Sequence, residues 1–417
     1  MNQTTYIPRL VDNEITRQLS AMGALLIEGP KWCGKTRSSL EFSHSAFYTM
    51  DNQELAKILP DEVLRGDTPR LIDEWQLEPV LWDRARRLID TRELPGQFIF
   101  TGSSTPEKEQ PVHSGVGRFA LVRMHPMSLY ESKESDGTIS LSTLFEEKTI
   151  KMHQSPYSLS HILWALVRGG WPASLSLEKK AAALLAGNYV KLMQKREFPT
   201  SRKGAPLDRA KLTLFIRALA RVSAQTANLS TIIADVRERA GTLARDTAEN
   251  YLNGLHNVFF AIDQPAWNVS LRAKVILRQT PKRHLADPSL AAAALSATPE
   301  KLRHDFRTLG HLFESLCFRD VSIYAQSMEG ELSFYKDSSN FEVDQIINLA
   351  DGRWAAIEVK LGDDQLDDAA VKLKELLNRV DTRHIGAPAF LAILYAGQYA
   401  YTREDGVHVI PITCLRP

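Results

Sequence analysis

The stretch GPKWCGKT, residues 29–36, has the residue types and spacing of a phosphate-binding loop. It fits the pattern G-x-x-x-x-G-K-[ST] and directly follows the apolar run ALLIE. Glycines let the backbone curl so that its N–H groups face phosphate oxygens, and a following helix adds partial positive charge. Lys35 is predicted to neutralise the β and γ phosphates, and Thr36 to ligate Mg²⁺. The alternative is a glycine-rich turn that binds nothing.

The residues around this loop fit the arrangement that the chemistry needs. Residues 24–28 read as a short buried strand, and residues 35–42 have helical propensity. Trp32 and Cys33 stand at variable positions of the loop, where local packing is the expected role. The predicted nucleotide contacts are Gly29, Pro30, Lys31, Trp32, Cys33, Gly34, Lys35, Thr36, Arg37 and Thr101.

A metal-binding acid and a water-positioning group are expected at the ends of neighbouring strands. In PRLIDEWQ, Leu71 and Ile72 form a brief predicted strand. Asp73 is predicted to bind Mg²⁺ through water, and Glu74 to orient the attacking water. An isolated LIDE is more often an ordinary strand end, but the phosphate loop upstream favours the metal acid.

Two further segments supply hydroxyl and cationic candidates. QFIFTGSS predicts a third strand that ends in Thr101, Ser103 and Ser104, which are candidates for sensing the γ-phosphate. A strand followed by a plain turn is the alternative. GVGRF places Arg118 in a glycine-bounded loop predicted at the same strand edge. Arg118 is a candidate for stabilising phosphate charge, in its own chain or across a subunit contact, and an ordinary surface arginine is the alternative.

The order of GPKWCGKT, LIDE, FTGSS, GVGRF and HPMSLYE resembles that of prokaryotic AAA-superfamily ATPases with a C-terminal domain of uncharacterised function. The resemblance covers nearly the whole chain and is densest in residues 20–135. It implies a P-loop domain with a sensor strand between the two Walker strands. It also implies Glu74 as the catalytic acid.

Length and composition favour a multidomain cytoplasmic protein. With 417 residues and 44% hydrophobic content, the chain is long enough for about three domains. No apolar stretch approaches the ~20 residues of a membrane span, and the polar N-terminus is unlike a secretory signal. Cys33, Cys317 and Cys414 lack metal-ligand spacing and are expected to be reduced thiols. Because the formal net charge is only +1, nucleic-acid binding would need a local basic patch.

The middle of the chain changes from polar to helical. Residues 132–160 are serine-rich and predict an exposed connection, and the apolar spacing after them predicts helices that form a lid or bridge. Residues 229–268 read as helix, turn, helix and strand pair. This order suits a winged helix, and the resembling family has one at this position. If it binds DNA, Arg245, Asn250 and Asn253 would face a major groove.

A basic strip follows in LRAKVILRQTPKRH, which no acid interrupts. Phosphate contact is predicted from such a strip. Winged helices also serve as protein-binding scaffolds, and basic strips are also plain solvated faces, so DNA and a protein partner both stay open. The basic residues are Arg272, Lys274, Arg278, Lys282 and Arg283.

Two strands near the C-terminus bring acidic residues together. Residues 341–349 and 354–360 predict antiparallel strands joined at Asp351-Gly352. Because side chains alternate along a strand, Glu358 shares one face with Lys360.

On the partner strand, Glu342 and Asp344 share a face in the same way. Asp344 with Glu358 could hold Mg²⁺ or Mn²⁺, while Lys360 orients or deprotonates the water that attacks a phosphodiester. The alternative is a solvated hairpin with alternating charges.

This pattern resembles the PD-(D/E)xK nuclease fold. The resemblance assigns catalytic positions to Glu314, on a predicted amphipathic helix, and to Asp344, Glu358 and Lys360. Val343 stands where that pattern has proline.

The sequence thus predicts an α/β protein with an AAA-type P-loop core, a helical and winged-helix middle and an α/β restriction-endonuclease-like C-terminal domain. The predicted function is ATP binding and hydrolysis coupled to a DNA-associated domain whose nucleolytic activity is left open. The alternative is a nucleotide-dependent regulatory switch with an inactive nuclease-like domain that binds a protein partner. The oligomeric state is not predicted. The expected domains are residues 1–135 (ATPase core), 136–225 (linker and helical bridge), 226–280 (winged helix) and 281–417 (nuclease-like).

Overall fold

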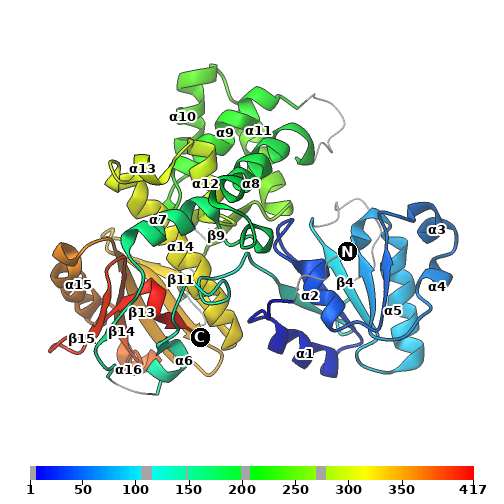
Figure 1. Cartoon of the computed structure of the whole chain (residues 1–417), viewed down its shortest axis with the longest axis horizontal. Coiled ribbons are helices and arrows are strands. Elements are labelled where there is room, and N and C mark those ends of the chain that lie inside the picture. The colour runs from blue at the N-terminus through cyan, green and yellow to red at the C-terminus, as the bar shows by residue number, and fades with distance from the viewer. Residues whose placement is uncertain (1–5, 105–114, 147–148, 199–206, 269–278) are drawn as a thin grey trace. The chain divides into compact units, whose positions relative to one another are not determined.

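A computed structural model describes residues 6–104, 115–146, 149–198, 207–268 and 279–417 (Figure 1). The chain forms two compact units. The first consists of Met1–Pro126 with Asn257–Phe259, and the second of Met127–His256 with Phe260–Pro417. The division into four domains predicted from the sequence stays a prediction.

The first unit is built on a parallel five-stranded sheet in the order β2-β3-β4-β1-β5. The strand predicted to carry the sensor hydroxyls, β4, lies between the loop strand β1 and the acid strand β3, which confirms the arrangement implied by the resemblance. The strands are β1 (Ala24–Glu28), β2 (Ser45–Tyr48), β3 (Arg70–Asp73), β4 (Phe98–Gly102) and β5 (Phe119–Arg123).

Helices cover this sheet, and alternating side chains of its strands supply two cores. Leu25 and Ile27 of β1 pack with Ile15 of α1, while Ala24 contributes to an aromatic core on the other side. In that second core Trp75 and Trp82 stack with ring centroids 4.7 Å apart. A strand buried on both faces reads as a continuous apolar run, as ALLIE does. The helices are α1 (Asp12–Ala21), α2 (Lys35–Glu41), α3 (Gln53–Ile58), α4 (Pro60–Val63) and α5 (Val80–Arg92), with the 3₁₀ turn η1 (Trp75–Leu77).

The part of the second unit from residue 159 to residue 256 is mainly helical, as the apolar spacing predicts. The helix, turn and helix predicted in residues 229–268 are confirmed in α10 and α11, whereas the strand pair is not confined to that range, because β9 pairs with β10 at Lys282–Leu285. The assignment of a winged helix stays a prediction. The elements are α7 (Leu159–Arg168), η2 (Pro172–Ser174), α8 (Lys179–Leu192), η3 (Met193–Glu197), α9 (Arg209–Arg221), β8 (Gln225–Thr226), α10 (Leu229–Ala240), α11 (Arg245–Asn257), β9 (Ala261–Gln264), β10 (Lys282–Leu285), α12 (Pro288–Leu295) and α13 (Pro299–Leu302).

A seven-stranded mixed sheet in the order β11-β12-β13-β14-β16-β15-β7 completes the second unit. The predicted hairpin of β12 and β13 is confirmed as an antiparallel pair. β13, β14 and β16 run parallel, with α15 connecting β13 to β14. The elements are α14 (Phe306–Ser327), β11 (Gly330–Lys336), β12 (Glu342–Leu349), β13 (Trp354–Lys360), η5 (Asp363–Gln365), α15 (Leu366–Arg379), α16 (Thr382–Ile385), β14 (Leu391–Tyr395), β15 (Tyr399–Thr402), β16 (His408–Pro411) and η6 (Ile412–Cys414).

The serine-rich segment after residue 132 is not the exposed connection predicted from its composition. Its strand β7 (His153–Gln154) extends the large sheet, and β6 (Ile139–Ser140), which leads into α6 (Leu141–Leu144), pairs with β17 (Leu415–Arg416). Ser135, for example, is buried, and its Oγ donates a hydrogen bond to the Leu415 carbonyl at 2.7 Å, so that a protein acceptor takes the place of water. Polar composition alone does not distinguish an exposed connection from a segment that pairs with the sheets of the fold.

A buried ion pair in this segment makes the stability of the second unit acid-sensitive. Arg168 Nη1 donates to Glu134 Oε1 at 2.8 Å, and His161 Nε2 lies 3.3 Å from the same oxygen. Burial by itself would raise the pKa of Glu134, but the bonds from His161 and Arg168 lower it from 4.5 to about 2. A carboxyl with a lowered pKa stabilises the fold above its unfolded pKa, and this contribution is lost as the pH falls from 4.5 toward 2.

Replacing Glu134 with Gln is therefore expected to lower the free energy of unfolding near pH 7 by roughly 3 kcal/mol. The variant should also lose less stability than the wild type on acidification. Urea denaturation between about pH 3 and pH 7 measures both effects. Glu146→Gln is the matched control, because Glu146 is 70% exposed and pairs with Arg353 on the surface. Equal acid sensitivity of wild type and Glu134→Gln would contradict the assignment.

Over the described ranges, none of the helices combines the length and apolar character needed to cross a bilayer. Cys33, Cys317 and Cys414 are buried free thiols, which confirms the predicted reduced state.

Candidate functional site

The loop predicted to bind phosphate connects β1 to α2, and its two glycines are required by the backbone. A Cβ atom on Gly29 would lie 2.1 Å from the Met124 carbonyl oxygen, so no other residue fits there without displacing backbone. Gly34 has φ 108°, a left-handed value that side chains disfavour. The two glycines of the motif are thus the residues that the backbone conformation of the loop requires.

Lys35 and Thr36 lie at the carboxyl end of the sheet beside the acid strand. The buried Lys35 Nζ donates to the carbonyl oxygens of Gly29 at 2.9 Å and Pro30 at 3.0 Å. Thr36 Oγ1 donates to Asp73 Oδ1 at 2.8 Å, and Thr101 Oγ1 donates to the same oxygen at 2.5 Å. Burial raises the pKa of Asp73, although the bonds from Thr101 and Thr36 oppose the shift. Three segments distant in sequence therefore meet at one carboxylate.

Glu74 is oriented by the strand next to its own. It has φ 52°, and its N–H donates to Thr101 Oγ1 at 3.2 Å. Its carboxylate accepts hydrogen bonds from Ser103 Oγ at 2.7 Å and from Gln76 Nε2. The structure thus brings the predicted water-orienting acid and two of the predicted sensor hydroxyls together. Ser104 follows β4, two residues beyond its end at Gly102.

The remaining loop residues differ in their surroundings. Cys33 is buried and its Sγ donates to the Met124 carbonyl at 3.7 Å, as local packing predicts. Trp32 is 50% exposed, so only part of its surface can take part in the packing predicted for it. Lys31 is partly exposed, and Arg37 pairs with Glu41 one turn along α2. The direct contacts of these residues with a nucleotide stay predictions.

Arg118 does not lie at the edge predicted for it. The parallel register places Phe119 beside Ala24, and the Arg118 carbonyl accepts from the Ala24 N–H at 3.0 Å. Arg118 therefore stands beside the start of β1, about 16 Å along the strand from the loop. Its side chain pairs with Asp90 at 2.8 Å. A role within its own chain is excluded by this register, and a role across a subunit contact stays a prediction.

Two arginines near the loop were missed by the sequence reasoning. Arg123 ends β5 opposite Glu28 and pairs with it at 2.6 Å, directly before the loop. The buried Arg9 donates to the Cys33 carbonyl at 2.8 Å and to the His125 carbonyl at 2.9 Å, and so ties the loop to the chain after β5. No local motif marks either residue, because strand register brings Arg123 to the loop and tertiary contacts bring Arg9 there.

The second candidate site lies in the other unit, where α14, β12 and β13 bring the predicted nuclease residues together. Asp344 Oδ2 accepts from the Val359 N–H at 2.9 Å and lies 3.8 Å from Lys360 Nζ. Lys360 Nζ donates to Glu358 Oε2 at 2.6 Å, and Lys372 Nζ of α15 lies 2.8 Å from Glu358 Oε1. The grouping predicted for these side chains is confirmed, and their catalytic roles stay predictions.

An unpredicted lysine occupies the centre of this cluster. Lys282 Nζ lies 2.6 Å from Glu314 Oε1, 2.8 Å from Glu342 Oε1 and 3.1 Å from Asp344 Oδ1. Burial would lower the pKa of Lys282, but Asp344, Glu314 and Glu342 raise it well above its ordinary value. The group is thus a buried ammonium ion.

The burial of Lys282 changes the interpretation of the predicted basic strip, of which this residue is a part. Lys282 is 1% exposed in its side chain, and the buried Arg283 pairs with Asp263. The prediction that these two residues contact DNA phosphates is wrong, because carboxylates of the protein already bind them. Arg272, Lys274 and Arg278 lie outside the described residues.

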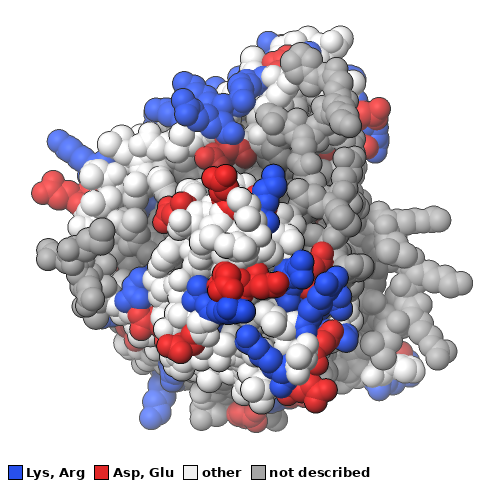
Figure 2. All heavy atoms as spheres, turned by 90° about the vertical axis from the view of Figure 1, so that its right-hand side faces the viewer, with Lys and Arg blue, Asp and Glu red and all other residues white. Residues whose placement is uncertain are grey.

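Other basic residues gather around a cavity of about 560 Å³ in the second unit. Its lining contains one carboxylate, Asp305, and a nearby one, Asp235, pairs with Arg221 and Arg239. On the face shown in Figure 2, by contrast, acidic and basic side chains are interspersed, in agreement with the net charge of +1. The cations of the lining are Arg217, Arg221, Arg239, Lys301 and Arg307, with His311 beside them.

The helix predicted to face a major groove is α11. Arg245, Asn250 and Asn253 are all exposed on it, and Arg245 pairs with Glu249 at 2.8 Å. Their exposure permits contact with a partner, and groove binding stays a prediction.

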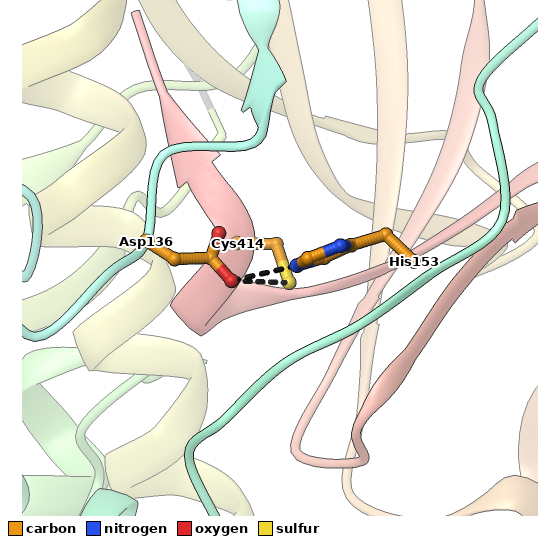
Figure 3. Close-up of side chains that lie close together, drawn as sticks. All are labelled: Asp136, His153 and Cys414. Atoms are coloured by element: carbon orange, nitrogen blue, oxygen red, sulfur yellow. Dashed lines mark hydrogen bonds and ion pairs between the residues drawn. The ribbon is translucent and has the colours of Figure 1, made fainter.

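A third group of potential metal ligands consists of Asp136, His153 and Cys414 (Figure 3). His153 Nε2 lies 2.7 Å from Asp136 Oδ2, and Cys414 Sγ donates to the same oxygen at 3.9 Å. Burial and the Asp136 charge raise the pKa of the Cys414 thiol to about 12. Without a metal ion the thiol therefore keeps its proton at neutral pH.

Comparison with known families defines the class of the first unit. Residues 22–133 match the family described as AAA domain. Together with the loop geometry and the strand order, this match identifies a P-loop domain of the AAA type. Residues 161–301 and 309–415 match two families described as domains of unknown function, DUF8612 and DUF4143.

Individual proteins are similar over most of the chain. Uncharacterized proteins of Mycobacterium bovis and Mycobacterium tuberculosis are each 22% identical over 406 residues, which is 95% of this chain and 82% of each relative. A Walker-type ATPase of Pyrococcus abyssi aligns with a TM-score of 0.41 and 13% identity, over 68% of this chain and 94% of that one.

The replication initiator DnaA, bound to AMPPCP and single-stranded DNA, aligns with a TM-score of 0.27 and 11% identity, over 59% of this chain and 86% of that one. With both TM-scores below 0.5, the class of the first unit follows from the AAA match and the geometry of the loop.

Proposed function

We propose that the first unit binds Mg²⁺-ATP and hydrolyses it. Loop N–H groups and Lys35 would hold the β and γ phosphates, and Thr101 would sense the γ-phosphate. The oxygen donors of Thr36 and Asp73 fit Mg²⁺, which neutralises phosphate charge when it is bound. Glu74, held by Ser103 and Gln76, would orient the attacking water and accept its proton.

The observation that carries this proposal is the convergence of Thr36 and Thr101 on Asp73 Oδ1, with Lys35 buried in the adjoining loop. ATP binding and turnover of the full chain, measured beside Lys35→Ala and Glu74→Gln, test it. Absence of ATP binding by folded wild-type protein in calorimetry would exclude it.

We propose as a second function that the other unit associates with DNA. The basic lining of the 560 Å³ cavity supports this proposal, because clustered cations bind phosphates by releasing counterions. The element order α14-β11-β12-β13-α15-β14 and the grouping of Glu314, Asp344, Glu358 and Lys360 support a nuclease-like fold for the C-terminal part. The alternative is a nucleotide-dependent switch whose second unit binds a protein. ATPase rates that do not respond to DNA, together with a protein partner bound in one nucleotide state, would favour the switch.

The double variant Arg217→Glu/Arg307→Glu is expected to weaken duplex DNA binding about tenfold at low salt. Both side chains line the cavity, so their loss should also reduce the dependence of log Kd on log salt concentration by about 2. Fluorescence anisotropy over a salt series measures both quantities. Arg65→Glu/Arg84→Glu makes the same charge change on surface ion pairs of the first unit and serves as the control. Equal affinity of both double variants would contradict the proposed surface.

A further inference from the structure

Three carboxylates surround the Lys282 ammonium group. Its three nearest oxygens come from Glu314 on α14 and from Glu342 and Asp344 on β12, at 2.6, 2.8 and 3.1 Å. An ammonium group has three N–H donors and no acceptor, and here it donates hydrogen bonds to Glu314 and Asp344 and pairs with the charge of Glu342. A buried charge is tolerated in proteins only with such compensation.

A divalent metal does not fit the same place. Mg²⁺ or Ca²⁺ bound by Glu314, Glu342 and Asp344 would need these oxygens as ligands at about 2.0–2.6 Å, and the oxygens already surround Lys282 Nζ. The ion and the ammonium group would therefore occupy one point. The two oxygens of Glu358, the other acid of the predicted metal site, likewise have Lys360 Nζ at 2.6 Å and Lys372 Nζ at 2.8 Å. Each carboxylate of the cluster has a lysine Nζ within 3.1 Å, although burial raises the pKa of Glu314 to about 8. The acids are Glu314, Glu342, Asp344 and Glu358, and the lysines are Lys282, Lys336, Lys360 and Lys372.

Lys282 is held there by the strand that carries it. β10 pairs with β9, which places Lys282 beside Gln264. His284 follows on the same face, lies 3.0 Å from Ser315 Oγ through Nδ1, and stacks on Phe318 with ring centroids 4.0 Å apart. Gln264 Nε2 in turn donates to the Asp344 carbonyl at 2.9 Å. The lysine is thus anchored on both sides of the cluster and is a fixed part of the fold.

We propose that Lys282 is a built-in cation that takes the place of a divalent metal, so that the nuclease-like domain binds no catalytic metal and cuts no phosphodiester. Asp344 and Glu358 would then not form the metal site predicted from the sequence. This role of Lys282 rests on the nuclease-like fold proposed above but is independent of the ATPase. Removal of the ammonium group should convert the cluster into a divalent-cation site, because uncompensated carboxylates are ligands that Mn²⁺ prefers.

Electron paramagnetic resonance of Mn²⁺ with the nucleotide-free full chain tests the proposal. Lys282→Gln is expected to bind Mn²⁺ at least about tenfold more tightly than the wild type, and the double variant Lys282→Gln/Asp344→Asn should lose this gain. Lys336→Gln is the matched control, since it removes a lysine from the rim of the same cluster, 3.1 Å from Glu342. Adding Lys35→Ala to each protein should change none of these results, which separates them from the P-loop.

Thermal melting gives a second readout. At a Mn²⁺ concentration of about a hundred times its Kd, the Tm of Lys282→Gln should exceed its value in EDTA by about 5 °C or more. No gain of Mn²⁺ binding in folded Lys282→Gln would overturn the proposal. If that variant does not fold, the wild type decides. Mn²⁺ binding or plasmid cleavage by the wild type that Asp344→Asn abolishes would overturn the proposal, and their absence supports it.

Discussion

Lys35→Ala is expected to lower ATP turnover by at least about a hundredfold and to weaken ATP binding. The Lys35 ammonium is buried within the loop and donates to the Gly29 and Pro30 carbonyls, so it stands where phosphate charge would gather. Its charge is worth more there than in water because the surroundings are less polarisable. Phosphate release and calorimetric titration with Mg²⁺-ATP measure the two effects.

Lys31→Ala is the matched control, because Lys31 lies in the same loop but at a variable position of the motif and is partly exposed. We expect it to change turnover by less than about tenfold, since Lys31 is predicted to contact the nucleotide but stands at a position where the motif requires no particular side chain. Circular dichroism and Tm must show that both variants are folded. Wild-type turnover in a folded Lys35→Ala variant would mean that the loop does not bind the reacting phosphates.

Glu74→Gln is expected to reduce turnover by about 10²–10⁴ while ATP binding is retained. The amide keeps the shape of the side chain and can still accept from Ser103 Oγ, which lies 2.7 Å from the carboxylate. It cannot accept the proton of the attacking water, so the chemical step should slow without loss of the nucleotide. Single-turnover kinetics separate this step from binding and product release.

Glu78→Gln tests whether any nearby carboxylate has the same effect. Glu78 follows four residues later and accepts a hydrogen bond from Gln53 at 2.9 Å near the surface. Its replacement should leave turnover within about twofold of the wild type, in line with the small effects of surface changes. A Glu74→Gln variant that hydrolyses ATP at the wild-type rate would assign the base to another group.

The phosphate loop and the acid strand could be predicted because their determinants are local. Eight consecutive residues specify the loop, since phosphates are bound by its own backbone and by Lys35 and Thr36. The parallel sheet follows from short apolar runs such as ALLIE, buried on both faces. The hairpin of β12 and β13 was likewise predictable, because Asp351-Gly352 favours a tight turn.

Strand register and burial were decided by the tertiary structure alone. Arg118 and Arg123 bracket the same strand, yet only the alignment of β5 with β1 determines that Arg123 is the one beside the loop. Lys282 is separated from Glu314 by 32 residues and from Asp344 by 62. A lysine in a basic stretch is normally exposed, and nothing near it in sequence indicates otherwise. Its burial becomes favourable only when the fold brings three carboxylates to one point, so its role depends on packing and not on the sequence around it.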